Sequence, residues 1–242
     1  MTFDLDIRAS TGFSNASHYD THRPSYPSAA VDKLLKNLGV FGVKDARIVD
    51  LASGTGKFTE LLVGREEEFE VVAVEPQPQM RGELVKKDLK GVKVVDGDAA
   101  NMPLEDGWGD SLVAAQVSDL FLGLPFIGKS QGRHGKWREV FEKQQDTTPF
   151  QTLKDTFTGN LPRFSLPLGE EDLEWTVFLS DEAIWDRYST LSQIANLKGK
   201  DGRFEEIRKE VFEALKGEDT ERNDAGEVAI HGRTHLAWTS RI

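Results

Sequence analysis

The 242-residue sequence contains no cysteine. This absence excludes disulfides, cysteine nucleophiles and cysteine-ligated zinc sites. Basic residues are also few, since 30 Lys and Arg stand against 41 Asp and Glu and give a formal net charge of −11. General binding to nucleic acid or to an anionic membrane surface depends on basic residues. We therefore expect neither partner.

Long apolar runs are absent too. No stretch approaches the length of apolar residues that a transmembrane helix needs, so none is predicted. The first residues carry Asp4, Asp6 and Arg8 without an apolar segment, which is not the pattern of a secretory signal. These features predict a cytoplasmic globular protein.

Short apolar runs alternate with helical spacing through the first half of the chain. Strands are predicted over 46–51, 70–75, 92–95 and 110–116, and helices over 29–38, 57–65 and 79–89. Such alternation predicts a mostly parallel sheet with helices on both faces. After residue 116 the alternation stops. A long amphipathic stretch over 173–196, a charged helix over 202–216 and a strand over 228–238 follow, with Trp175, Phe178, Trp185 and Tyr188 expected in the core.

A glycine turn follows the first predicted strand, and three nucleotide motifs compete for it. The P-loop pattern fails because Leu51 and Phe58 stand where it needs Gly and Ser or Thr. The dinucleotide fingerprint is partial, since Gly54 and Gly56 fit but Thr59 replaces the third glycine. A dinucleotide-dependent oxidoreductase is therefore disfavoured.

The third interpretation rests on acids that end three successive strands. Asp50, Glu75 and Asp98 each stand at or just after a predicted strand. The carboxyl ends of parallel strands lie at one edge of the sheet, where ligands bind. A glycine turn there lets the backbone pass close under a cofactor, because no Cβ intrudes.

Four segments resemble the motifs of class I S-adenosylmethionine-dependent methyltransferases, in the small-molecule branch often called methyltransferase type 11. The similar segments are 48–57, 73–81, 97–103 and 110–116, and Phe13, Tyr19 and Arg23-Pro24-x-Tyr26-Pro27 also match that branch. In that family the N-terminal segment folds over the cofactor as a lid. Weaker similarity continues to the terminal strand.

The resemblance implies a Rossmann-like methyltransferase fold, with a lid at 1–27 and one domain at 28–242. Residues 28–116 would form its cofactor-binding half and 117–242 its acceptor-side half. The implied S-adenosylmethionine-binding residues are Asp50, Ala52, Gly54, Gly56, Glu75, Asp98, Ala99 and Gln116. Lid or acceptor candidates are His18, Tyr19, Arg23 and Tyr26. The implied reaction is methyl transfer to a small-molecule acceptor, and no catalytic base stands out because a sulfonium methyl needs mainly alignment.

Two departures from the family pattern stand out. Ala52 replaces the first glycine of the turn. After Gln116 the family has a further helix and parallel strand, whereas residues 117–132 stand alone here. A natural deletion and a gene model that lost a segment both fit. We expect cofactor binding to survive better than turnover, and a non-catalytic cofactor-binding relative is the alternative function.

Two histidine pairs have a spacing of four residues, His18 with His22 and His231 with His235. Neither pair carries the carboxylate pattern of His-Glu-x-x-His. The sequence therefore predicts no metal site.

Overall fold

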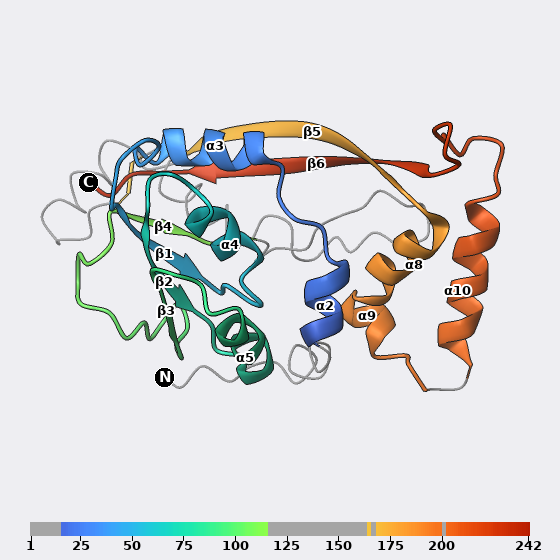
Figure 1. Cartoon of the computed structure of the whole chain (residues 1–242), viewed down its shortest axis with the longest axis horizontal. Coiled ribbons are helices and arrows are strands. Elements are labelled where there is room, and N and C mark those ends of the chain that lie inside the picture. The colour runs from blue at the N-terminus through green and yellow to red at the C-terminus, as the bar shows by residue number, and fades with distance from the viewer. Residues whose placement is uncertain (1–15, 116–163, 166–167, 200–201) are drawn as a thin grey trace, which may run out of the picture.

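The computed structural model describes residues 16–115, 164–165, 168–199 and 202–242 (Figure 1). Its helices are α2 (Ala16–His22), α3 (Ser28–Asn37), α4 (Lys57–Val63), α5 (Pro78–Lys86), α8 (Asp181–Ser189), α9 (Ser192–Ala195) and α10 (Arg203–Ala214). Its strands are β1 (Arg47–Leu51), β2 (Glu70–Val74), β3 (Val92–Val95), β4 (Ser111–Val113), β5 (Gly169–Leu179) and β6 (Val228–Trp238). The alternation predicted before residue 116 is confirmed.

Strands β1 to β4 form one parallel sheet in the order β3-β2-β1-β4. The crossovers from β1 to β2 and from β2 to β3 carry α4 and α5. The Rossmann-like fold class is thereby confirmed. The described residues supply four strands to this sheet, with β4 at one edge, and the segment after Gln116 lies outside them.

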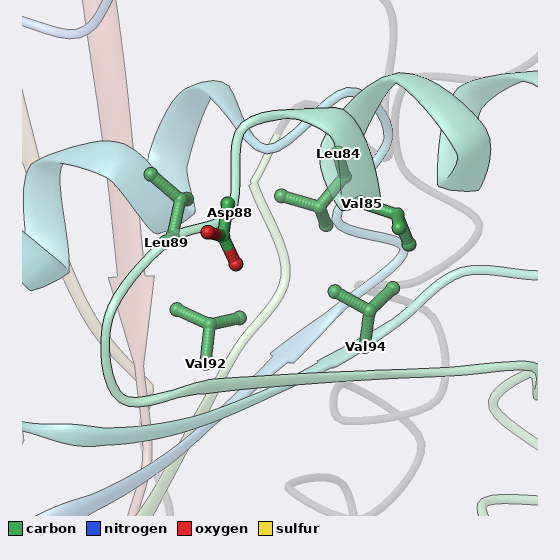
Figure 2. Close-up of a pocket in the computed structure, with 6 residues that line it drawn as sticks. All are labelled: Leu84, Val85, Asp88, Leu89, Val92 and Val94. Atoms are coloured by element: carbon green, nitrogen blue, oxygen red, sulfur yellow. The ribbon is translucent and has the colours of Figure 1, made fainter.

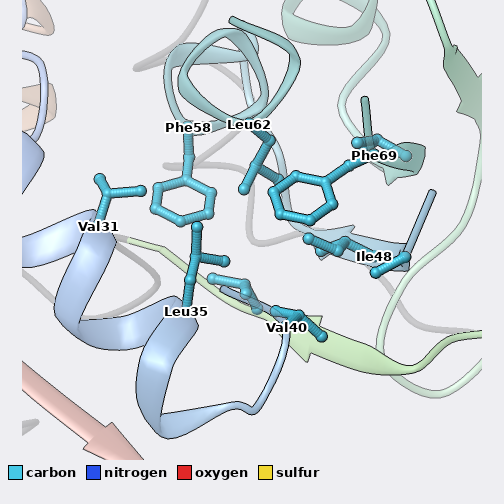
Figure 3. Packing of buried hydrophobic residues seen from close by; sticks show 10 residues of the cluster. Val31, Leu35, Val40, Ile48, Phe58, Leu62 and Phe69 are labelled. Carbon is cyan, nitrogen blue, oxygen red and sulfur yellow. The ribbon is translucent and has the colours of Figure 1, made fainter. Parts of the chain in front are cut away.

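The main core lies between α3, α4 and one face of this sheet (Figure 3). Its buried members are Val31, Leu35, Val40, Ala46, Ile48, Phe58, Leu62, Phe69, Val71 and Val113. Alternate strand residues face the same side of a sheet, so Ile48 and Val71 point to these helices. The helical spacing of Val31 and Leu35 presents both to the same core.

The opposite face of the sheet carries Val49, Val72 and Val74. Among the described residues, the loop after β3 packs on it through Met102, Leu104 and Trp108. Helices of the described part thus cover one face, and the coverage of the other face by helices stays a prediction.

Strands β5 and β6 form a separate antiparallel ribbon, paired from Gly169 with Trp238 to Leu179 with Val228. One end runs beside α3, where Lys33 Nζ lies 3.0 Å from Glu171 Oε2 (Figure 1). The other end carries α8, α9 and α10. A second core fills this lobe around Ile184, Trp185, Tyr188 and Val228.

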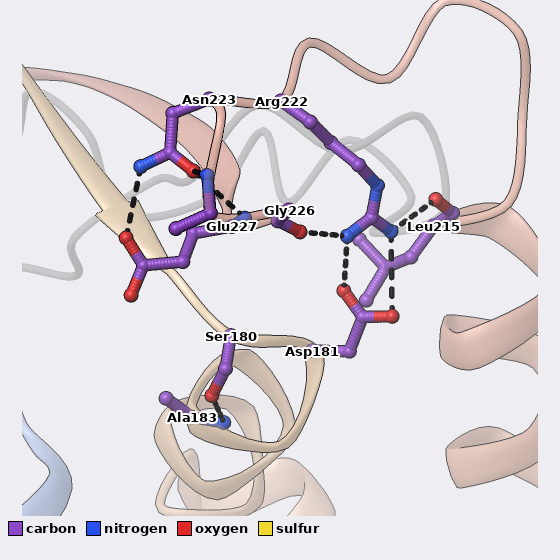
Figure 4. A network of polar contacts seen from close by, with 9 residues as sticks. Ser180, Asp181, Ala183, Leu215, Arg222, Asn223, Gly226 and Glu227 are labelled. Carbon is purple, nitrogen blue, oxygen red and sulfur yellow. Dashed lines mark hydrogen bonds and ion pairs between the residues drawn. The ribbon is translucent and has the colours of Figure 1, made fainter.

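A polar network closes the same lobe (Figure 4). The Arg222 guanidinium donates to Asp181 Oδ1 at 2.9 Å, to the Leu215 carbonyl at 2.9 Å and to the Gly226 carbonyl at 2.6 Å. The Ser180 hydroxyl accepts the Ala183 N–H and caps α8. The network therefore ties the start of α8 to the end of α10 and to the turn before β6.

The structure corrects the prediction of one amphipathic stretch over 173–196. Residues up to Leu179 belong to β5, and the chain enters α8 only after its Ser180 cap. Trp185 and Tyr188 are buried as predicted, whereas Phe178 is 40% exposed. Its strand alternates at a period of two residues, so a stripe at helical spacing cannot share one face there.

The pair His231 and His235 also lies in a strand, so four residues separate the rings by about 13 Å rather than one helical turn. His231 contacts Glu221 at 3.2 Å, and His235 contacts Asp172 at 2.7 Å. The two histidines do not form a common site.

A hollow of about 240 Å³ lies under α5 at the edge strand β3 (Figure 2). It is lined by Leu84, Val85, Asp88, Leu89, Val92 and Val94, and none of the implied cofactor residues contributes. Across the described ranges, every helix is too short or too polar to cross a membrane.

Candidate cofactor site

The glycine turn leaves β1 at Leu51 and enters α4 at Lys57. Three of its residues take positive φ angles, 55° at Ala52, 60° at Gly54 and 86° at Gly56. The left-handed region suits glycine, and for alanine it is strained. The replacement of the first glycine by Ala52 is therefore accommodated at an energetic penalty, which the surrounding contacts must offset.

The two glycines of the turn have different roles. A Cβ built on Gly54 meets no atom within 4 Å, so its backbone faces open space. A Cβ on Gly56 would overlap Leu84 Cδ1 of α5. Gly54 therefore leaves room for a ligand, whereas Gly56 allows close packing of α4 against α5.

Asp50 is fully buried at the carboxyl end of β1. Its Oδ2 accepts a hydrogen bond from the Thr59 hydroxyl at 2.6 Å, and its Oδ1 has no hydrogen-bond partner. Burial raises the pKa of Asp50 to about 7, and the negative charge of Glu75 adds to the rise. Buried polar atoms normally have hydrogen-bond partners, so the unpartnered Oδ1 can accept a hydrogen bond from a ligand or bind a ligand cation.

Glu75 follows β2 and faces the glycine turn. It is 6% exposed, and burial raises its pKa. The Gly54 N–H donates to its Oε2 and the Gln77 N–H to its Oε1, both at 2.8 Å. Glu75 thus holds the turn against β2, a role that the sequence did not predict.

Asp98 lies in the loop after β3. Its Oδ1 accepts the N–H groups of Ala100 at 2.7 Å and Asn101 at 2.9 Å, which closes a tight turn. Ala99 beside it is exposed. The other implied residue, Gln116, lies outside the described residues.

Gln77 also supports the site, without a clear signal in the sequence. Gln77 is 3% exposed and its Oε1 accepts from the N–H groups of Gln79 and Met80, which caps α5. The Ser53 and Thr55 hydroxyls are buried in the turn without a hydrogen-bond partner. A glutamine N-cap is uncommon, so the sequence carries no clear signal for it.

Helix α2 lies beside the carboxyl end of the sheet and contacts α5 and α8 (Figure 1). Lys87, just after α5, places Nζ 2.8 Å from Asp20 of α2 and 3.0 Å from Glu60 of α4. The Tyr26 ring packs edge-on against Phe58 at 5.3 Å, and burial raises its pKa. Tyr26 is therefore a packing residue of the main core, while Asp20 secures α2.

The other lid candidates face α8. Arg23 stacks on the Tyr19 ring at 4.9 Å, and its buried Nε has no hydrogen-bond partner. His18 and His22 lie with ring centroids 4.4 Å apart, and His22 Nδ1 is 3.6 Å from Asp186 of α8. One ligand atom from each of these three residues lies within 4.8 Å of the others. The structure thus brings together a possible metal-ligand trio that the sequence did not predict.

Residues 49–122 match the sequence profile of a family described as methyltransferase domain. This range begins in β1 and contains the glycine turn, Glu75 and Asp98. An uncharacterized methyltransferase of Mycobacterium tuberculosis is 28% identical over 202 residues, which cover 77% of this chain and 78% of that protein. An uncharacterized methyltransferase of Mycobacterium bovis matches equally well. These sequence matches support a class I S-adenosylmethionine-dependent methyltransferase.

Among solved structures, this methyltransferase resembles a SAM-dependent methyltransferase from Geobacter sulfurreducens in complex with S-adenosyl-L-homocysteine. The TM-score is 0.41 at 10% identity, with 100% of both chains covered. A Thiobacillus denitrificans SAM-dependent methyltransferase in the same type of complex gives 0.39 at 15% identity over 99% of this chain and 100% of that one. The family assignment rests on the sequence matches, because likenesses of this degree add nothing to it.

Proposed function

We propose that this methyltransferase binds S-adenosylmethionine at the carboxyl edge of β1 and β2 and transfers its methyl group to a small-molecule acceptor held between α2 and α8. The observation that carries the proposal is the pairing of the open glycine turn with two buried acids. Asp50 and Glu75 end neighbouring parallel strands, and Gly54 stands between them without steric cover. The residues present fit the cofactor.

Each acid suits a different part of the cofactor. The orphaned Oδ1 of Asp50 is an acceptor for the ammonium of the methionine moiety, and a cation there would favour the ionised carboxylate. Glu75 keeps lone pairs beyond its two backbone bonds and can accept from ribose hydroxyls. Asp98 and Ala99, past the end of β3, lie where the resemblance puts the adenine.

The bound cofactor supplies an electrophilic methyl group on a sulfonium, which needs an aligned acceptor and exclusion of water. The chain contributes alignment through the rigid turn, which α4 and α5 hold from one side. Helix α2, tied down by Asp20 and Lys87, lies beside the carboxyl edge of the sheet, and this position supports the lid assignment of residues 1–27.

The decisive experiment is calorimetry of the whole chain with S-adenosylhomocysteine, with NAD⁺ as the comparison ligand. Binding of S-adenosylhomocysteine alone supports the proposal. Binding of NAD⁺ alone would return the site to the dinucleotide alternative. A transfer assay with labelled S-adenosylmethionine and a panel of small acceptors then distinguishes an active enzyme from a relative that only binds cofactor.

A further inference from the structure

Arg187 of α8 is a buried cation. It is 4% exposed, and among the described residues no carboxylate forms an ion pair with it. Its Nε and Nη2 atoms have no hydrogen-bond partner. The ring of Trp175 lies 5.5 Å from its guanidinium carbon. A stacked ring compensates only part of the hydration that a buried charge loses. The arrangement therefore favours binding of an anion next to Arg187.

A second arginine acts on Arg187 although the chain as a whole is acidic. Burial and the charge of Arg23, which directly follows α2, lower the pKa of Arg187. Arg23 itself has a buried Nε without a partner. On the same interface, burial, His22 and Lys198 lower the pKa of His18, against the opposite effect of Asp186.

The two unsatisfied nitrogens of Arg187 also define the shape of a ligand. Nε and Nη2 lie along one edge of the guanidinium and donate in parallel. Carboxylates match this two-donor edge through bidentate hydrogen bonds. A lysine or a single backbone donor would not select for a planar anion in this way.

We infer that the interface of α2 and α8 is a carboxylate site, with Arg187 as its central ligand and Arg23 beside it, and that it anchors a carboxylic acid acceptor. This inference rests on the proposed function, because it takes the acceptor to lie between these helices. The carboxylate of the cofactor's methionine moiety is the other source of the same chemistry. We assign the site to the acceptor because Arg187 belongs to the lobe of α8 and α10, whereas Asp50 and the glycine turn belong to the parallel sheet.

The test compares Arg187→Met, which keeps an apolar stem of similar length, with Arg187→Lys, which keeps the charge but loses the fork. Arg208→Met is the matched control, since Arg208 pairs with Glu182 on the surface of the same lobe. Each whole-chain variant is melted with EDTA present at constant ionic strength, with and without S-adenosylhomocysteine. Succinate, citrate and benzoate are the probes, and succinamide and benzamide are their neutral counterparts.

At about ten times its Kd, a bound acid should raise the Tm by about 3–6 °C. We expect this shift from at least one acid with the original chain and with Arg208→Met, and from no amide. The shift should disappear in Arg187→Met and shrink in Arg187→Lys. Without ligand, Arg187→Met should melt no lower than the original chain, since it removes a buried unpaired charge. A lower Tm for that variant together with unchanged acid shifts would overturn the inference by showing a structural arginine.

Three further outcomes separate the competing explanations. If Arg187→Met weakens binding of S-adenosylhomocysteine but not of 5′-methylthioadenosine, which lacks the carboxylate, then Arg187 binds the carboxylate of the cofactor. The acceptor assignment is then wrong. If Zn²⁺ without EDTA raises the Tm through Asp186 while no acid does, the interface holds a metal and the inference is wrong. If S-adenosylhomocysteine does not bind the original chain, the proposed function fails. The Tm shifts that the acids cause without S-adenosylhomocysteine then test the carboxylate site independently.

Discussion

Replacing Glu75 by glutamine tests the link between cofactor binding and the shape of the turn. The side chain is almost fully buried and accepts one backbone N–H on each oxygen, from Gly54 and from Gln77. Glutamine keeps the shape but has one acceptor oxygen and one donor NH₂. One of the two N–H groups then faces a donor and stays unsatisfied.

The expected loss follows from that single unsatisfied group. A buried donor without a partner destabilises a protein by about 1–3 kcal/mol. For a chain of this size, 1 kcal/mol corresponds to about 2–4 °C, so Glu75→Gln should melt roughly 2–12 °C lower. Affinity for S-adenosylhomocysteine should also fall roughly tenfold or more, because one ribose hydroxyl loses a charged acceptor. The two backbone bonds to Glu75 are the reason why the Tm should fall together with the affinity.

Differential scanning fluorimetry and calorimetry measure the two effects on the same samples. Glu83→Gln is the control, since Glu83 pairs with Lys86 in an exposed contact across one helical turn. That variant should match the original chain in both measurements. A Glu75→Gln protein with an unchanged Tm and an unchanged Kd would refute both the supporting role and the ribose assignment.

Four other substitutions test the turn and its acid. Gly54→Ala should change the Tm little but lower the affinity for S-adenosylhomocysteine roughly tenfold or more in calorimetry, because its Cβ enters the ligand space. Gly56→Ala should mainly lower the Tm, because its Cβ overlaps Leu84. Equal behaviour of the two variants would contradict this distinction. Because the pKa of Asp50 is raised to about 7 from 3.8, the folded protein holds the proton longer and its stability falls as pH rises from about 4 to about 7. Asp50→Asn should therefore gain stability relative to the original chain between pH 4 and pH 7 in urea unfolding, by up to about 4 kcal/mol, and parallel pH profiles would speak against it. Ala52→Gly should raise the free energy of unfolding by about 0.5–1 kcal/mol, since it relieves a φ of 55°, and a loss in denaturant titration would show that the strain is absent.

The parallel sheet could be predicted from the sequence because every strand there is an apolar run bounded by a turn. The acid at each strand end could also be placed, since sheet direction determines where it lies. The backbone bonds to Glu75 could not be predicted, because they depend on how far the turn folds back over β2. The same holds for the role of Gly56, which is decided by Leu84 of another helix.

The second half was harder to predict because its contacts are distant in sequence. Trp175 and Trp185 suggested one helical stripe, yet a strand ends between them at Leu179. His22 and Asp186 lie at 3.6 Å although 164 positions separate them in the chain. No periodic pattern records such a contact, so the trio at α2 and α8 and the unpaired Arg187 could be found only in the structure.

The length of the β5–β6 ribbon determines the distance between the parallel sheet with α3 and the lobe of α8 and α10. Each of its strands has 11 residues, which span about 36 Å at 3.3 Å per residue. One end is fastened beside α3 and the other carries the lobe of α8 and α10, so the strand length sets the reach of that lobe toward the glycine turn. Two residues added to each strand would preserve the facing of every side chain and shift the lobe by about 7 Å.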